Sequence, residues 1–466
     1  MTWGGATRFA RARWSGRSRA VGMFFATSLA ARAIGISCQL LQVPIAMQAL
    51  GAEAFGLWMT LTGIGAMIAF ADFGIGLGAQ NKLAEAFGAG HLARAKELWD
   101  STLVFFLLVG VALAAGLAGL LPVIDFTRAF NLTEPAVQAQ AGAAVAATLG
   151  VFCLNFPLGL AQRLALSRQQ GWQHNIVLAA GSVGGLAAMA TAVWSGASLP
   201  IVILAAQGPL VLGNAVLLQT QLRALGWTKL HAVRARWATM RELGTLGASF
   251  GVQQLQHTLF ISLPPLIIST QLGAAAVTPY NLAQRLFNLF GVVQSAFMLP
   301  LWPAYSDAKA KHDYAWIRRT LRRSLAATLL GSLAPMALGA AFAQPLLAAW
   351  VGSESSLPSA TLLWLMFAWN ALVFIGQPFG YLLAGLSVVR RLTQYAVVSS
   401  VLSSLLMWAL VRDHGAPGVV LGMSIGFLPF LVRANIIEAV QVLRRLPATS
   451  HAPPAMIPHA AVESRS

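Results

Sequence analysis

Charged residues are scarce in this chain of 466 residues, and acidic residues are scarcer than basic ones. Asp and Glu number 14 against 31 Lys and Arg, and charged residues make up 10% of the sequence, compared with about 25% in soluble domains. Hydrophobic residues make up 57%, and the mean hydropathy is +0.68. Such a composition excludes a water-soluble globular protein and indicates that lipid is the main solvent.

Cysteine and the common catalytic motifs are also scarce. Cys38 and Cys153 both lie within apolar segments, which argues against a disulfide framework or a metal site. No lysine follows a glycine, so the phosphate-binding GxxxxGK[ST] loop is missing, as are HExxH and DxD. We therefore expect no ATP hydrolysis, no cofactor and no catalysis by this chain.

Long apolar segments are what the chain does contain. A helix that crosses a bilayer needs about 20 residues, and twelve segments meet this length. The first six are approximately Val21–Met47, Phe55–Gln80, Leu98–Leu121, Ala141–Leu160, Asn175–Trp194 and Leu199–Leu218. The next six are approximately Leu246–Thr270, Val277–Leu301, Leu325–Trp350, Ala360–Leu386, Leu392–Val411 and Val419–Val442.

Basic residues fall into alternate gaps between these segments. Of the 31 Lys and Arg residues, 26 lie in one set of gaps, whereas the other set holds Arg128 and Arg412. Because basic loops stay in the cytoplasm, both termini are predicted to be cytoplasmic. The net charge of +17 then serves topology and anionic headgroups, and nucleic-acid binding is not expected.

The chain divides into two similar halves. We predict an all-α polytopic membrane protein with two six-helix bundles, at 21–222 and 246–446. A basic cytoplasmic arm (1–20), a basic cytoplasmic linker (223–245) and a disordered cytoplasmic tail (447–466) complete the division. A shift of 222 residues superposes Leu50-Gly51-Ala52 on Leu272-Gly273-Ala274. Parallel repeats of this kind place a substrate cleft between the halves, although a chance match of small residues would look the same.

Polar stripes run along three of the apolar segments. Arg32 lies about halfway along the first, with Gln39 on the same face. Burying an arginine at the bilayer centre costs at least about 2.5 kcal/mol, so this face should line a water-filled cavity. The other two stripes, in the eighth and seventh segments, contain Asn281, Gln284, Arg285 and Asn288, and Gln253, Gln256 and His257. We interpret these residues as substrate-binding, and His257 as a candidate for proton coupling; polar contacts between helices are the alternative.

Asp72 is the acidic residue that lies well inside an apolar segment. The second segment begins outside, which places Asp72 close to its cytoplasmic end. We predict a helix-end or gating residue that pairs with a basic loop. Gly74, Gly76 and Gly78 after it do not follow a strand, so they are interpreted as packing positions and not as a nucleotide loop.

One stretch resembles a known family. The sequence Leu50-Gly51-Ala52-Glu53-Ala54-Phe55-Gly56-Leu57-Trp58, followed by Ala71-Asp72-Phe73-Gly74-Ile75-Gly76 and Asn81-Lys82-Leu83-Ala84-Glu85-Ala86, resembles the oligosaccharide flippases of the bacterial MOP superfamily, the Wzx-type and polysaccharide-transporter proteins. The resemblance implies a V-shaped, MATE-like fold with inward- and outward-facing states in the inner membrane. It also implies movement of undecaprenyl-diphosphate-linked oligosaccharide from the cytoplasmic to the periplasmic leaflet, beside a polysaccharide polymerase.

The polar stripes agree with that expectation. Arginine suits a diphosphate because its planar guanidinium donates in pairs, and Arg32 and Arg285 are the candidates. Coupling to a proton or sodium gradient would replace ATP. A MATE-type exporter of cationic drugs is the main alternative, although such exporters use membrane carboxylates, which the first and seventh segments lack. A membrane glycosyltransferase or ligase is a further alternative, and the longest outer gap, Pro122–Gln140, offers it few carboxylates.

Overall fold

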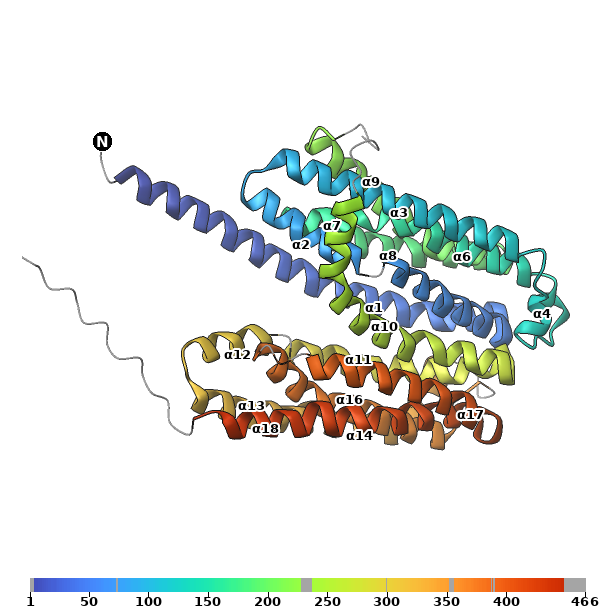
Figure 1. The fold of residues 1–466 in the computed structure, drawn as a ribbon. Helices are drawn as coiled ribbons and strands as arrows, with labels where there is room; N and C mark the ends of the chain where they lie inside the picture. Colours follow the sequence, from blue (N-terminus) through green and yellow to red (C-terminus); the bar gives the residue numbers. More distant parts are fainter. Residues whose placement is uncertain are drawn as a thin grey trace, which may run out of the picture.

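The computed structural model describes residues 4–72, 74–227, 237–298, 300–351, 356–386, 388 and 390–447, and these residues form helices and their connections (Figure 1). Within these ranges, the side chains of residues 4–26, 245–258 and several isolated positions are not described. The tail beyond residue 447 and residues 228–236 of the basic linker lie outside the described residues.

Two lobes make up the molecule (Figure 1). The N-lobe contains α1 (Gly4–Ile68), η1 (Ala69–Asp72), α2 (Ile75–Gly88), α3 (Leu92–Leu120), α4 (Phe126–Ala129), α5 (Pro135–Gln138), α6 (Ala141–Leu158), α7 (Leu160–Ser167), α8 (Gly171–Trp194) and α9 (Leu199–Ala224). The C-lobe contains η3 (Ala274–Ala276), α11 (Val277–Met298), α12 (Leu301–Ala310), α13 (Tyr314–Thr328), η4 (Leu329–Leu333), α14 (Ala334–Ala341), α15 (Ala343–Val351), α16 (Ala360–Gly385), α17 (Arg390–Pro429), η5 (Phe430–Ile437) and α18 (Glu438–Arg445). Helix α10 (Trp237–Leu272) connects the lobes and contacts both.

Glycines reverse the chain where two apolar segments follow each other closely. Helix α1 folds back at Gly51 (φ 79°) and α17 at Gly415 (φ 63°), while Gly273 (φ 95°) precedes η3 and α11. A positive φ is accessible to glycine without the steric cost that a Cβ imposes. Gly51 and Gly273, which the shift of 222 residues superposes, therefore share one backbone role.

Eight described helical stretches are long and apolar enough to cross a membrane. Two of them, Thr27–Ile68 and Gln394–Arg445, each contain two of the expected segments. The seventh and eighth expected segments correspond to α10, of which Leu259–Leu272 is an apolar stretch among the described residues, and to α11, which its own polar stripe interrupts. The expected all-α polytopic fold is confirmed.

Some elements differ from the expected segments. The second segment does not run unbroken to Gln80, because the 3₁₀ turn η1 and Gly74 (φ 80°) separate α1 from α2. The ninth segment contains the π-helical turn η4. Helix α1 begins at Gly4, so the basic arm continues into the first span as one helix.

The two ends of the molecule differ in how the lobes pack. The loops after α2 and after α12 lie at one end, here named the basic end, and α4 lies at the other, the turn end (Figure 1). The turn at Gly273 lies at the turn end because it packs against Asn131 after α4, and the helix after Gly51 approaches Ala274 there. One buried hydrophobic cluster, which includes Phe55, Ile268 and Phe374, draws residues from both lobes. The remaining two clusters, around Trp99 and around Tyr305, lie toward the basic end, and the second contains C-lobe residues alone. The lobes are therefore packed together at the turn end and have separate cores toward the basic end.

Candidate functional site

A cavity of about 470 Å³ lies between α1 of the N-lobe and α11 and α16 of the C-lobe. The charged side chains among its described lining residues are Arg32 and Arg285. Its polar lining also includes Gln39, Asn288, Ser295, Asn370 and Gln377. The structure thus brings together the first-segment and eighth-segment stripes, 246 residues apart at Gln39 and Arg285, in one space between the lobes.

Arg285 bridges the lobes. Its Nη1 donates to the backbone carbonyl of Gln39 at 2.8 Å, and its Nη2 lies 3.3 Å from the sulfur of Met59. The guanidinium also stacks over Phe55, 6.0 Å from the ring centroid. These partners are a neutral carbonyl, a thioether and an aromatic face, none of which carries a compensating negative charge. The arrangement leaves the cation available to an anionic ligand.

Four other predicted residues line cavities. The side chains of Arg32 and Gln39 are exposed along α1 and face the shared space. Gln284 and Asn288 line a second compartment, described below, and Asn288 lines both.

Asn281 does not reach either cavity. It is 7% exposed, and its side chain donates to the carbonyl of Val277 at 3.2 Å within α11. The predicted substrate contact at this position is replaced by a polar contact inside the helix. The side chains of Gln253, Gln256 and His257 lie outside the described residues.

A second compartment of about 300 Å³ adjoins the first inside the C-lobe. Its walls are aromatic, from Phe260 of α10, Trp369 of α16 and Phe427 of α17, and its polar groups include Gln284, Asn288 and Asn370. Asn288, Asn370 and Val373 line both spaces. The two compartments are therefore adjacent, with one cationic and the other lined by aromatic rings.

Sequence reasoning did not single out Asn370, Gln377 or Trp369. Asn370 and Gln377 are two helical turns apart on α16, so their spacing is the same signal that identified the other stripes. Trp369 offered no such signal, because an aromatic residue in an apolar helix can face lipid, core or cavity equally well.

Close backbone approach seals the turn end. A Cβ added to Gly56 would lie 1.8 Å from the carbonyl oxygen of Ala274, so only glycine permits this contact. Thr278 donates to the carbonyl of Ala52 at 2.7 Å, and Asn131 donates to the carbonyl of Thr270 at 2.7 Å. The cavity is closed toward the turn end by this contact between α1 and the start of the C-lobe.

A proline in α1 creates a further contact between the lobes. Pro44 has no N–H, so the carbonyl four residues earlier, at Leu40, lacks its helical donor. The indole N–H of Trp350 in α15 donates to that carbonyl at 2.9 Å. Pro378 acts alike in α16, where Gln294 donates to the carbonyl of Phe374 at 3.4 Å. The vacated carbonyls serve as acceptors for side chains from other helices.

Asp72 lies at the break between α1 and α2. It is 4% exposed and accepts a hydrogen bond from the backbone N–H of Gly74 at 2.9 Å. Arg163 of α7 lies close enough to interact electrostatically with Asp72 and donates to Gln80 at 3.3 Å. His174 of α8 is near this pair, and its Nδ1 is buried with no hydrogen-bond partner among the described residues. Asp72 thus lies at the end of a helical element. The basic residue near it, Arg163, lies in helix α7 and not in a loop.

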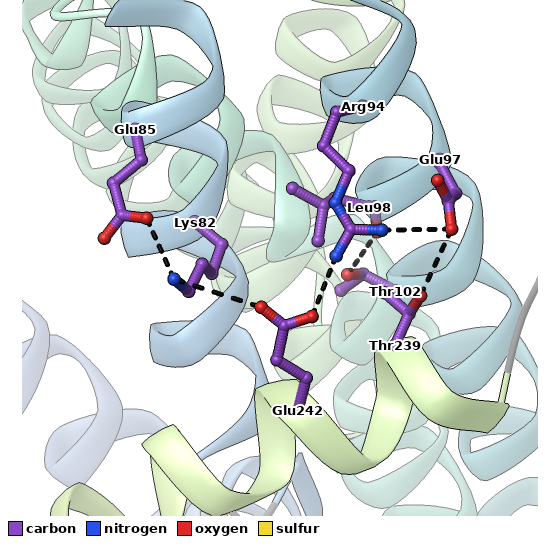
Figure 2. Close-up of polar contacts among 8 residues, drawn as sticks. All are labelled: Lys82, Glu85, Arg94, Glu97, Leu98, Thr102, Thr239 and Glu242. Carbon is purple, nitrogen blue, oxygen red and sulfur yellow. Dashed lines mark hydrogen bonds and ion pairs between the residues drawn. The ribbon is translucent and has the colours of Figure 1, made fainter. Parts of the chain in front are cut away.

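The basic end carries a network of charged side chains (Figure 2). Glu242 of α10 pairs with Arg94 of α3 at 2.8 Å and lies 3.9 Å from Lys82 of α2. The hydrogen bond to Glu85 at 2.9 Å raises the pKa of Lys82 above its ordinary value. Because α10 also packs along α17 of the C-lobe, its first turns belong to the N-lobe and its later turns to the C-lobe.

The fold is that of an all-α polytopic membrane protein with a cavity between its two lobes. In structural comparison, the chain resembles an inward-facing multidrug resistance MATE family transporter of the MOP superfamily, with a TM-score of 0.70 and 16% identity over 91% of this chain and 100% of that one. The lipid II flippase MurJ in its inward closed conformation gives a TM-score of 0.66 and 12% identity, over 91% of this chain and 88% of MurJ.

The sequence comparison finds relatives whose names state what they transport. A protein of Salmonella typhimurium named "Putative O-antigen transporter" is 21% identical over 85% of this chain and 93% of its own length. A protein of the same name from Salmonella typhi is 18% identical over 86% of this chain and 92% of its own length. No protein-family model matches the chain. The resemblance to polysaccharide transporters of the MOP superfamily that was drawn from the sequence is confirmed.

Proposed function

We propose that this chain is a flippase that moves undecaprenyl-diphosphate-linked oligosaccharide from the cytoplasmic to the periplasmic leaflet of a bacterial inner membrane. The observation that carries the proposal is the cavity between the lobes, which holds Arg32 and Arg285 beside several amide side chains. The Salmonella relatives named for O-antigen transport and the fold shared with MurJ support it. These relatives are transporters and flippases, which also supports transport over sugar transfer.

The chemistry of the cavity suits a diphosphate headgroup. Guanidinium groups bind phosphate oxygens through paired, charge-assisted hydrogen bonds. Arg285 now donates to one backbone carbonyl, and a phosphate would offer it stronger acceptors at little structural cost. The amides of Asn288, Asn370 and Gln377 can donate to and accept from sugar hydroxyls.

Alternating access fits the packing of the lobes. Contacts close the turn end, whereas separate hydrophobic clusters lie toward the basic end. With the basic end in the cytoplasm, as the distribution of Lys and Arg predicts, this arrangement is an inward-facing state. Transport would require the turn end to open and the basic end to close while the lipid tail stays in the bilayer.

Coupling to a proton or sodium gradient is part of the proposal. Asp72, with Arg163 and His174 nearby, is a buried carboxylate inside the N-lobe, and His257 remains a predicted candidate. Dissipating both gradients should stop net movement of the lipid-linked oligosaccharide in energised vesicles. Unchanged movement would contradict the coupling and leave the flippase assignment standing.

Export of cationic drugs is the alternative that the fold itself permits, given the MATE neighbour. The cavity does not favour it, because the charges among its described lining residues are positive and would repel a cation. A drug exporter with this site would need carboxylates from elsewhere.

The test is transbilayer movement of undecaprenyl-diphosphate-linked oligosaccharide in liposomes that contain the purified chain. Arg32→Ala and Arg285→Ala should each abolish movement while the protein remains folded. Arg412→Ala is the matched control, because Arg412 is exposed and bonds Gln271 in the C-lobe, away from the lining of the cavity. Normal movement in both cavity variants would refute the proposed site, and transport of cationic dyes alone by the wild type would favour drug export.

A further inference from the structure

The aromatic compartment of the C-lobe is built differently from the cationic cavity beside it. Three rings that pack against one another line one side of it, with centroid distances of 5.0 Å between Phe260 and Trp369, 5.9 Å between Phe260 and Phe427 and 5.3 Å between Trp369 and Phe427. None of its described lining residues is charged. The compartment therefore suits a neutral group with an apolar face.

Polar groups nevertheless enter this compartment. Gln284, Asn288 and Asn370 line it with amides that can both donate and accept. Asn370 Nδ2 also donates to the carbonyl of Met366 at 2.8 Å, which leaves its oxygen and its second N–H for a ligand. A purely apolar occupant, such as a lipid tail, would strip water from these amides without replacing their hydrogen bonds, which is unfavourable. An occupant with several hydroxyl groups would satisfy them.

Tyr280 supplies an independent observation. The residue is 0% exposed and lines the compartment, yet its hydroxyl has no hydrogen-bond partner among the residues that the structure describes. Buried hydroxyls are nearly always hydrogen-bonded, so the hydroxyl of Tyr280 has capacity for a partner that enters the compartment. A hydroxyl-bearing ligand in the compartment would pair it.

We infer that this compartment binds one uncharged sugar ring of the lipid-linked substrate, the ring adjacent to the diphosphate. The C–H face of the ring would pack against Trp369, and its hydroxyl groups would bond Tyr280, Asn288 and Asn370. The shared residues Asn288 and Asn370 place this ring beside the cationic cavity, so the compartment selects the first sugar while Arg32 and Arg285 hold the phosphates. The inference rests on the proposed function.

The test compares two ligands that differ by one sugar. Affinities are measured for undecaprenyl diphosphate and for undecaprenyl diphosphate bearing a single neutral hexose, on full-length protein in nanodiscs. The wild type should bind the sugar-bearing lipid about tenfold more tightly, which corresponds to about 1.4 kcal/mol. Trp369→Ala should remove most of this preference, and Tyr280→Phe should reduce it about threefold. Affinity for the bare lipid should stay the same in both variants.

Two controls keep the result interpretable. Trp364→Ala, on the same helix but 48% exposed, should leave the preference unchanged. Tyr280→Phe removes a hydroxyl that no described residue bonds, so its thermal midpoint should not fall, and this variant tests the compartment even if Trp369→Ala folds poorly.

Each other outcome is decisive. Equal affinity of the wild type for both lipids would overturn the sugar compartment and leave the flippase assignment intact. An unchanged preference in folded Trp369→Ala and Tyr280→Phe would do the same. Failure of the wild type to bind either lipid would overturn the proposed function, and the compartment with it.

Discussion

Gly56→Ala should prevent the turn end from closing. In the structure a Cβ at this position would lie 1.8 Å from the carbonyl oxygen of Ala274, and Cβ atoms essentially never approach a heavy atom closer than 3.0 Å. Helix α1 and the start of the C-lobe would have to move apart by about 1.2 Å, the difference between these distances. The obstacle is backbone, so no side-chain rotation can relieve it.

The cost follows from the packing of both lobes around this contact. Overpacking by one methyl group in a well-packed region typically costs about 1 to 3 kcal/mol. Because the clash exists in the closed turn end and is relieved when it opens, this cost falls on the state in which the turn end is closed. A differential of that size changes the ratio of two states by roughly 5- to 150-fold.

Distances between spin labels would measure the shift. Nitroxides at Ala136 of the N-lobe and Asp413 of the C-lobe, both exposed near the turn end, would be placed in a chain without Cys38 and Cys153. Gly56→Ala should move the distance distribution toward longer values and slow transport. Gly119→Ala is the control, because a Cβ there meets nothing within 4 Å. An unchanged distribution in a folded Gly56→Ala protein would refute the argument that this contact closes the turn end.

Three further variants test other features. Glu53→Gln should lower the free energy of unfolding by about 1 to 3 kcal/mol. The buried carboxylate accepts hydrogen bonds from Thr133 N at 2.5 Å, Thr133 Oγ1 at 2.8 Å and Glu134 N at 3.0 Å. An unaltered midpoint of thermal denaturation would contradict this. A double-mutant cycle of Arg94→Ala and Glu242→Ala should give a coupling below about 1 kcal/mol that fades with salt, since both side chains are 40% exposed; a large, salt-independent coupling would show that the pair is more than a surface contact. Gly74→Ala should destabilise by about 1 to 2 kcal/mol because of its φ of 80° before α2. Gly88→Ala at the other end of α2, where a Cβ meets nothing, should be neutral or stabilising.

Much of the fold was predictable because a bilayer imposes few solutions on a chain. Long apolar segments must be helices, and the alternation of basic gaps predicts the direction in which each helix crosses the membrane. The meeting of Arg32 and Arg285 was predictable for the same reason, since each cation inside an apolar segment requires a polar space and a cleft between the halves offers one to both. Their helices do line one cavity.

The other features of the site depend on tertiary contacts, which produce no periodic pattern in the sequence. Asn281 shares the spacing of Gln284, Arg285 and Asn288. It lies one turn earlier in α11, however, and its side chain bonds the carbonyl of Val277 in the same helix. The break at Asp72 was hidden because glycine in a membrane helix signals packing as often as a turn. The aromatic compartment was hidden because Trp369 and Phe427 become neighbours only when α16 and α17 pack together.

Pro44 changes what separation of the lobes costs. The carbonyl of Leu40 that Trp350 bonds stands outside the hydrogen-bond ladder of α1, because the proline removed its helical donor. Losing Trp350 therefore breaks no backbone bond within the helix, and water entering the opened space can replace the indole. Helix α1 can therefore separate from α15 without losing any of its own backbone hydrogen bonds. The contact can break and re-form without unfolding the helix that carries Arg32.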